Sequence, residues 1–130
     1  MRRKIKSSLI SSSGDGSWVT DSVIRGYTAP AASNLGATLK GYMAMSNARE
    51  PELLGPHLVE IHAPVRLIVG TAPHDGDVSS EEVELLHKAL VTFAVDSVSG
   101  AGHFIQEERP QGIMISLDRL QQNLRDTGSP

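Results

Sequence analysis

The residues best suited to chemistry are two aspartates and one histidine in two separate turn-rich segments. Asp75 and Asp77 flank Gly76, and His103 follows a short glycine-rich run that begins at Gly100. A carboxylate beside an imidazole accepts a hydrogen bond from one ring nitrogen, fixes the tautomer and stabilises the imidazolium formed when the other nitrogen takes a proton. The pattern predicts an oriented general base. A structural alternative stays open, in which the aspartates are turn residues and the histidine packs in its own turn.

Two short apolar runs must position these residues. Residues 65–70 form a short β-branched run ended by glycine and predict a buried strand, and residues 91–98, with apolar positions on both faces, predict a second strand. Between them, Ser79 and Glu82 form a capping box that begins a helix ending near Leu90. Strand-helix-strand units are parallel and right-handed, so the loops after both strands lie at the same edge of the sheet. We therefore expect the two aspartates and the histidine to meet there.

The other segments predict helices. Four cations among the first six residues favour a short, frayed helix over a targeting signal, because little apolar surface accompanies them. Thr20 is the predicted N-cap of a helix of one or two turns that Pro30 follows rather than continues. Asn34 caps an amphipathic helix that runs to about Arg49 and needs a partner surface. A last amphipathic helix follows Pro110.

Composition excludes several classes of protein. The chain has 130 residues, a formal net charge of −3 and an apolar fraction of 39%, which fits one domain or part of one. Its acidity and 4% aromatic content argue against a nucleic-acid partner. No apolar run approaches the roughly 18 residues needed to cross a bilayer, so we expect no membrane partner. With no cysteine, disulfides and thiolate metal sites are excluded, and a cytoplasmic location is the simplest expectation.

The histidines do not favour a metal site. His57 and His62 flank four residues in a proline-bounded loop, and with His74 and the aspartates they form no paired-ligand spacing. We therefore expect no metal and no cofactor.

Four motifs occur in one order along the chain: Pro64-Val-Arg-Leu-Ile-Val-Gly70, Asp75-x-x-Val78, Gly100-Ala-Gly-His103-Phe, and Glu107 or Glu108 before Pro110. Together they resemble the carboxyl-terminal third of an α/β-hydrolase, in which the seventh strand leads to the triad acid and the eighth to the triad histidine. The resemblance implies that His103 is the catalytic histidine. It favours Asp75 as the acid, because Asp75 keeps the relation to Val78, with Asp77 as the alternative.

Residues from about Val19 to Met45 resemble the helical cap that many α/β-hydrolases insert before the seventh strand, and the resemblance as a whole covers about 17–124. It divides the chain into a cap-like segment, 1–56, and a strand-helix-strand-helix part, 57–130. It also implies a substrate pocket lined by Tyr42, Met43 and Phe104, although a helix packing stripe is the alternative role for the first two.

One part of the family pattern is absent. The nucleophile of this family stands on a Gly-x-Ser-x-Gly elbow ahead of the acid, and this sequence contains no such motif. The expectation is an α/β chain with a partial hydrolase fold, two parallel strands, an N-terminal helical cap segment and the N-terminal half of the sheet missing. Such a chain belongs to a hydrolase of small, largely apolar esters or related compounds, but is inactive alone.

The alternative is a non-catalytic truncated or interaction module that pairs with a partner chain. In either case, short unpaired strands need a complement, so we expect self-association or a requirement for the missing half.

Overall fold

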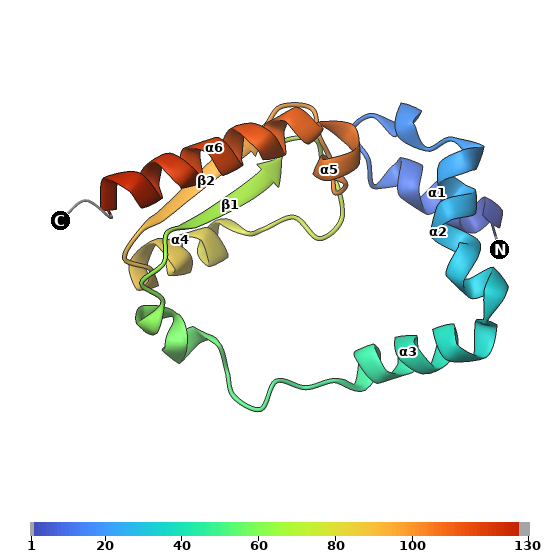
Figure 1. The fold of residues 1–130 in the computed structure, drawn as a ribbon, viewed down its shortest axis with the longest axis horizontal. Coiled ribbons are helices and arrows are strands. Elements are labelled where there is room, and N and C mark those ends of the chain that lie inside the picture. The colour runs from blue at the N-terminus through green and yellow to red at the C-terminus, as the bar shows by residue number, and fades with distance from the viewer. Residues whose placement is uncertain (1, 128–130) are drawn as a thin grey trace.

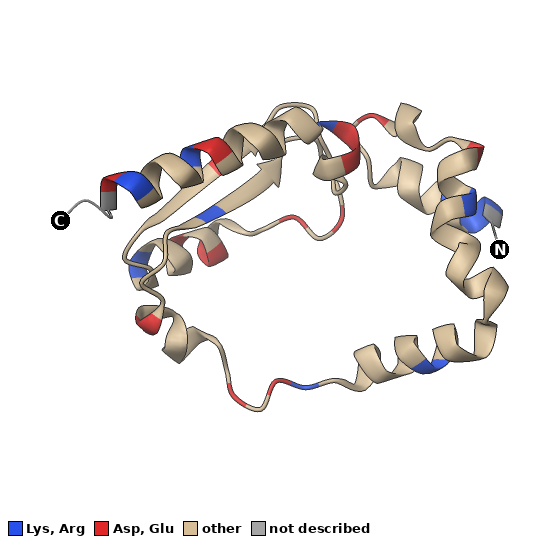
Figure 2. Ribbon diagram, viewed as in Figure 1, with Lys and Arg blue, Asp and Glu red and all other residues tan. Residues whose placement is uncertain are grey.

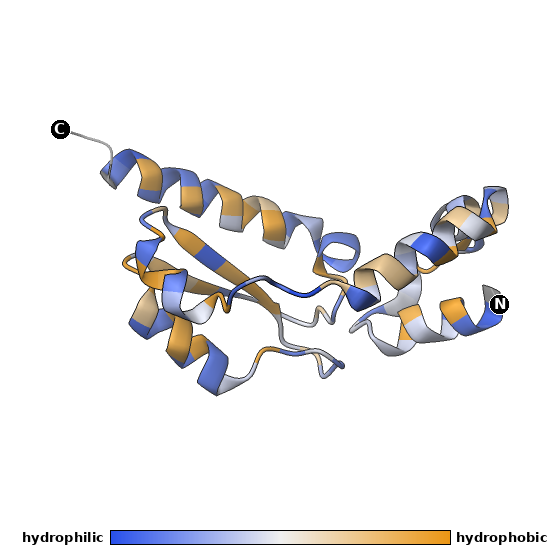
Figure 3. Cartoon of the chain, turned by 90° about the horizontal axis from the view of Figure 1, so that it is seen from below, coloured by the Kyte–Doolittle hydropathy of each residue, from blue (hydrophilic) through white to orange (hydrophobic). Residues whose placement is uncertain are grey.

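A two-stranded parallel sheet covered on both faces forms one end of the molecule. The computed structural model describes residues 2–127. Strand β1 (Val65–Gly70) pairs in parallel with β2 (Phe93–Val98). Helix α4 (Ser80–Ala89) and helix α6 (Pro110–Thr127) lie on opposite faces of these predominantly apolar strands (Figure 1, Figure 3). The described chain is therefore a mixed α/β protein.

The local signals of the strand-helix-strand unit are confirmed. Strand β1 has the predicted bounds, and both bonds of the capping box are present. The Glu82 amide donates to Ser79 Oγ at 3.2 Å, and the Ser79 amide donates to Glu82 Oε2 at 2.9 Å. Strand β2 begins two residues later than predicted, because the chain bends at 91–92, and Val91 is 73% exposed.

Three helices form the N-terminal part: α1 (Arg2–Ser11), α2 (Asp21–Ser33) and α3 (Leu35–Asn47). The predicted caps are confirmed, since Thr20 Oγ1 accepts from Val23 N at 3.3 Å and Asn34 Oδ1 accepts from Ala37 N at 2.9 Å. Short 3-10 turns occur at 16–18 (η1) and 55–60 (η2), and α5 (Ile105–Glu108) precedes α6. None of the described helices is both long and apolar enough to cross a membrane.

The predicted length of α2 is wrong. Pro30 lies inside this 13-residue helix instead of following it. A proline in a helix removes one backbone donor, the one that would bond to the carbonyl of Gly26. Gly26 is exposed, so water can bond to that carbonyl, and the Asn34 amide restores the ladder by donating to the Pro30 carbonyl at 3.0 Å. The helix therefore tolerates the proline near its end.

The hydrophobic core is small and lies between the N-terminal helices and the loop after β2. Its buried members are Leu9, Val19 and Ile24, and the rings of Trp18 and Phe104 pack against it with centroids 5.4 Å apart. The core thus joins the first two helices to the segment that carries His103.

A buried polar network joins α6 to the sheet. Asp96, in the middle of β2, is 6% exposed and accepts two bonds from Arg66, at 2.7 and 2.9 Å. It also accepts from Ser116 Oγ at 2.6 Å and from the guanidinium of Arg119, both on α6. The predicted second strand is present, and the charge of Asp96 is tolerated within it because four donors surround the carboxylate.

Candidate functional site

The loops after β1 and β2 meet at the carboxyl edge of the sheet, as parallel strand order requires. They enclose a cavity of about 130 Å³, lined by the strand ends and by His74, Gly76, Asp77 and His103. The structure therefore brings the predicted histidine and one of the two predicted acids to a single cavity.

Backbone contacts hold the two loops against each other. The Gly100 amide donates to Thr71 Oγ1 at 2.9 Å, and the Ala72 amide donates to the Ala101 carbonyl at 2.9 Å. A Cβ at Gly70 would lie 2.3 Å from that same carbonyl oxygen, so only glycine fits at the end of β1. The relative position of the two loops is therefore set by close main-chain packing, together with one bond to the short side chain of Thr71.

The imidazole of His103 is exposed and faces the acid-bearing loop. A Cβ built on Gly76 would lie 3.8 Å from His103 Cε1 and 3.9 Å from its Nδ1. Gly76 also has a φ of +80°, which favours glycine. On its other sides the ring packs edge-on against the rings of Phe104 and His74, with centroids 5.0 and 5.8 Å away. The Nδ1 edge of the imidazole is thus the one presented to the segment that contains both aspartates.

The two aspartates differ in placement. Both are exposed, but Asp77 lines the cavity and its Oδ1 accepts from the Val78 amide at 2.9 Å, whereas Asp75 does not line it. Among the described residues, no hydrogen bond joins either carboxylate to His103. The structure gathers an acid and a base at one cavity without forming the bond between them.

His74 is a member of this site that the sequence analysis considered only among unlikely metal ligands. Its Nδ1 lies 2.7 Å from the Ala72 carbonyl oxygen. A carbonyl only accepts, so we assign the proton to Nδ1, which leaves the Nε2 lone pair of neutral His74 available as an acceptor. The signal that could have found it is its place in the same loop as the aspartates.

Glu108 supports the histidine loop from behind. Its buried carboxylate accepts from the Gly102 amide at 3.0 Å and from the Asp15 amide at 2.9 Å. Glu107 instead accepts from the Tyr27 hydroxyl at 2.9 Å. The pKa of Tyr27 is raised, mainly by partial burial and also by this bond. Of the two glutamates that the sequence left as alternatives, Glu108 is the one that contacts the loop of His103.

The serine-rich loop after α1 packs closely against the loop that carries His103. The His103 amide donates to the Ser12 carbonyl at 2.8 Å. A Cβ at Gly14 would lie 2.1 Å from the Gly100 carbonyl oxygen, and one at Gly102 would lie 2.6 Å from Ser12 O. Such close backbone packing requires glycine in both segments.

The three residues predicted to line a substrate pocket differ in their surroundings. Phe104 packs between Trp18 and His103. Tyr42 and Met43 are on α3, 69% and 61% exposed, and do not line the cavity of His103.

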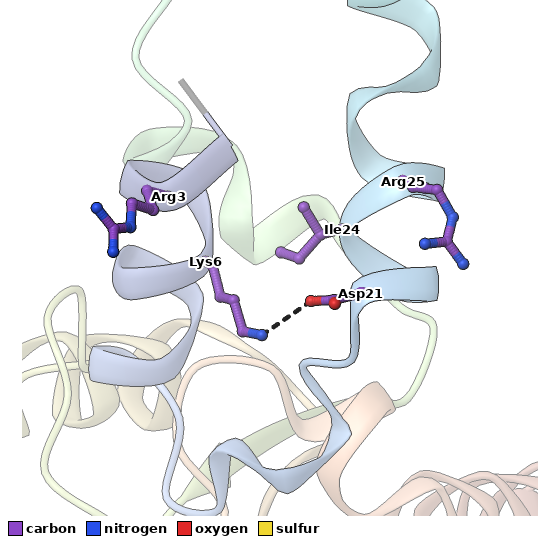
Figure 4. A pocket seen from close by; sticks show the side chains of 5 residues that line it. All are labelled: Arg3, Lys6, Asp21, Ile24 and Arg25. Atoms are coloured by element: carbon purple, nitrogen blue, oxygen red, sulfur yellow. Dashed lines mark hydrogen bonds and ion pairs between the residues drawn. The ribbon is translucent and has the colours of Figure 1, made fainter.

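A second cavity, of about 440 Å³, lies between α1 and α2 and is lined by Arg3, Lys6, Asp21, Ile24 and Arg25. Figure 4 shows Lys6 and Asp21 pointing toward each other across it, with their atoms 3.0 Å apart, while Arg3 and Arg25 point outward. The pair with Lys6 lowers the pKa of Asp21. The cations of this cavity therefore do not converge on a common ligand position.

Comparison with known proteins adds no assignment. No model of a known protein family matches this chain, and no curated protein is significantly similar to it. Within residues 2–127, no group of three or more histidine, aspartate or glutamate side chains is arranged to hold a metal ion.

Proposed function

We propose that this chain supplies the acid and histidine of a hydrolase site in the α/β-hydrolase manner, acting on an ester or a related bond of a small molecule. The nucleophile comes from a segment outside these 130 residues, because the sequence contains no Gly-x-Ser-x-Gly elbow. We also propose a cytoplasmic location.

The observation that carries the proposal is the position of the His103 ring. Its Nδ1 edge faces Gly76, which lies between Asp75 and Asp77 in the sequence. This contact is at the carboxyl ends of the parallel strands. In a triad, the acid bonds to one ring nitrogen and the other takes the proton of the nucleophile. Asp77 or Asp75 would hold Nδ1, which leaves Nε2 to act on a nucleophile brought by the missing segment.

An esterase assay on two proteins tests the proposal. The 130-residue chain alone should not hydrolyse p-nitrophenyl acetate above the level of its His103→Ala variant, because general-base help without a nucleophile and oxyanion donors is too small. The same chain extended in frame by its upstream coding sequence should be active. His103→Ala should then remove nearly all of that activity. An inactive extended chain, or an active His103→Ala variant, would contradict the proposal.

The acid is identified in the same extended protein. Replacing the true acid with asparagine should lower kcat by roughly 10⁴-fold, because the ring is held in the wrong tautomer. We therefore compare Asp75→Asn with Asp77→Asn. Motif spacing favours Asp75, whereas the cavity favours Asp77, so the variant that loses activity decides between them.

A non-catalytic role as an interaction module is the second candidate, and the exposure of α3 favours it. Figure 2 shows that α3 carries almost no charge, and its apolar residues Leu35 and Leu39 are each 53% exposed. Apolar, uncharged and exposed helices often mark protein contacts. If the extended chain forms a stable complex with a partner chain and has no esterase activity, this role would be favoured over the hydrolase.

A further inference from the structure

An apolar groove lies beside the cavity of His103. Its volume is about 410 Å³, and it is formed by η2, β1, α4 and the loop that precedes α4. Its walls are mainly leucine side chains: Leu54, Leu58, Leu67, Leu85 and Leu86. This combination of a concave shape and aliphatic walls is typical of sites for apolar small molecules.

The groove shares three lining residues with the proposed catalytic cavity. Gly76, Asp77 and Val78 line both spaces. Small-molecule sites usually have volumes of about 300–1,000 Å³. The cavity of His103, at about 130 Å³, is below that range, whereas the groove lies within it. A ligand that fills the groove would therefore present one end to the loop facing His103.

The charged groups on the groove select against anions. Among the described residues that line the groove, Asp77 and Glu82 are the ionisable ones, and both are acidic. Hydrogen bonds from Ser79 lower the pKa of Glu82, which keeps this carboxylate negative at neutral pH. A free fatty acid would bring a third negative charge to this end, whereas a neutral ester would not.

We propose that this groove binds the aliphatic chain of a neutral ester, with the ester group beside Asp77 and His103. This inference rests on the proposed function and adds its substrate class, a medium-length acyl or alkyl ester. The leucine walls bind the chain, and the two acidic residues exclude the corresponding free acid.

Titration of the 130-residue chain with methyl octanoate, followed by the methyl NMR signals of its leucines, tests the binding. Shifts should be concentrated on the five groove leucines and on the amides of 76–78. Shifts of equal size on Leu35 and Leu39 of α3 would show unspecific adsorption and overturn the proposal. Absence of binding because a second copy covers the groove, detected by sedimentation, would overturn it as well.

Two matched variants locate the ligand. Leu85 lines the groove on α4 and is 54% exposed, whereas Leu117 on α6 is outside it and 45% exposed. Both positions are exposed enough to accept glutamate without loss of the fold. Leu85→Glu should weaken methyl octanoate binding by about tenfold, since it removes an apolar wall and adds a hydrated charge. Leu117→Glu should change it by less than about twofold.

Charge selection is tested with octanoate in place of the ester. At low salt, octanoate should bind at least about threefold more weakly than methyl octanoate, and Asp77→Asn should reduce that ratio. Equal affinity for both probes would overturn the inference. These measurements need no catalysis, so binding without activity in the extended chain would reject the proposed function alone. Activity on p-nitrophenyl acetate without octanoate-ester binding would reject only the groove.

Discussion

Helices α6 and α3 are both amphipathic by sequence, yet only α6 has a surface to cover. Ser116 of α6 is 2% exposed and bonds to Asp96 in the sheet. Helix α3 has no buried residue, and Tyr42 is 69% exposed. Periodicity shows that one side of a helix is apolar, but the surface that covers it depends on distant parts of the chain. The sheet end should therefore be sensitive to substitution, and α3 should not.

The largest contrast should come from removing the charge that holds α6. Asp96→Asn leaves the guanidinium of Arg66, which is 12% exposed, without its negatively charged partner. Breaking a buried pair in this way costs roughly 3 kcal/mol or more of unfolding free energy. Leu39→Ala on α3 should change that free energy by less than about 0.5 kcal/mol. Urea denaturation of both variants measures the difference, and similar midpoints would remove the distinction between the two regions.

Acid should reduce the same contribution in the wild-type chain. Hydrogen bonds from Arg66, together with those from Ser116 and Arg119, outweigh burial and hold the pKa of Asp96 well below its usual range. A carboxyl with a depressed folded-state pKa contributes stability above its unfolded pKa, near 3.9, and loses it as the pH falls further. We expect wild type to lose stability between about pH 5 and pH 2, and Asp96→Asn to lose less. Parallel pH profiles would show that this network is not the acid-sensitive element.

Local signals explain which parts of the sheet end were predictable. The β-branched run that ends at Gly70 and the capping box of Ser79 and Glu82 each depend on residues close together in the sequence, and both are confirmed. The meeting of the two loops follows from parallel strand order. The hydrogen-bond network of Asp96 was not predictable, because its partners Arg66 and Ser116 are 30 and 20 residues away in the sequence.

The candidate site shows the same limit. His103 and the acids were found by residue type and position, but the choice of Glu108 over Glu107 needed the structure. The hydrogen bond that the Asp15 amide donates to Glu108 spans 93 residues, and no local sequence pattern indicates it. The prediction that α2 ends before Pro30 was wrong for a different reason. A single lost hydrogen bond near an exposed helix end costs less than the general rule that proline breaks helices implies.

Alanine in place of glycine should act with opposite signs in the two regions. At Gly102, a Cβ would lie 2.6 Å from backbone atoms of both Ser12 and Gly14, so Gly102→Ala should destabilise the chain by about 1–3 kcal/mol. At Gly41 in α3, nothing lies within 4 Å of the added Cβ. Gly41→Ala should stabilise by up to about 1 kcal/mol through helix propensity. Thermal unfolding of both variants gives the signs, and a stabilised Gly102→Ala would refute the close backbone packing.

The smallest effect should appear in the association state, where α3 acts without changing the folded core. Leu35, Leu39, Tyr42 and Met43 are each at least 53% exposed, so the isolated chain should self-associate weakly as its concentration rises. Light scattering should show an average mass above that of the monomer, and Leu39→Lys should return it toward the monomer. That substitution adds a charge to a helix that packs against little, so the unfolding midpoint should stay within the small range expected of a surface change. The chain could instead show a monomeric mass at every concentration and a sharp, concentration-independent thermal transition. That result would mean that the apolar side of α3 stays exposed to water without a partner. The contrast between α3 and α6 would then concern stability alone and not binding.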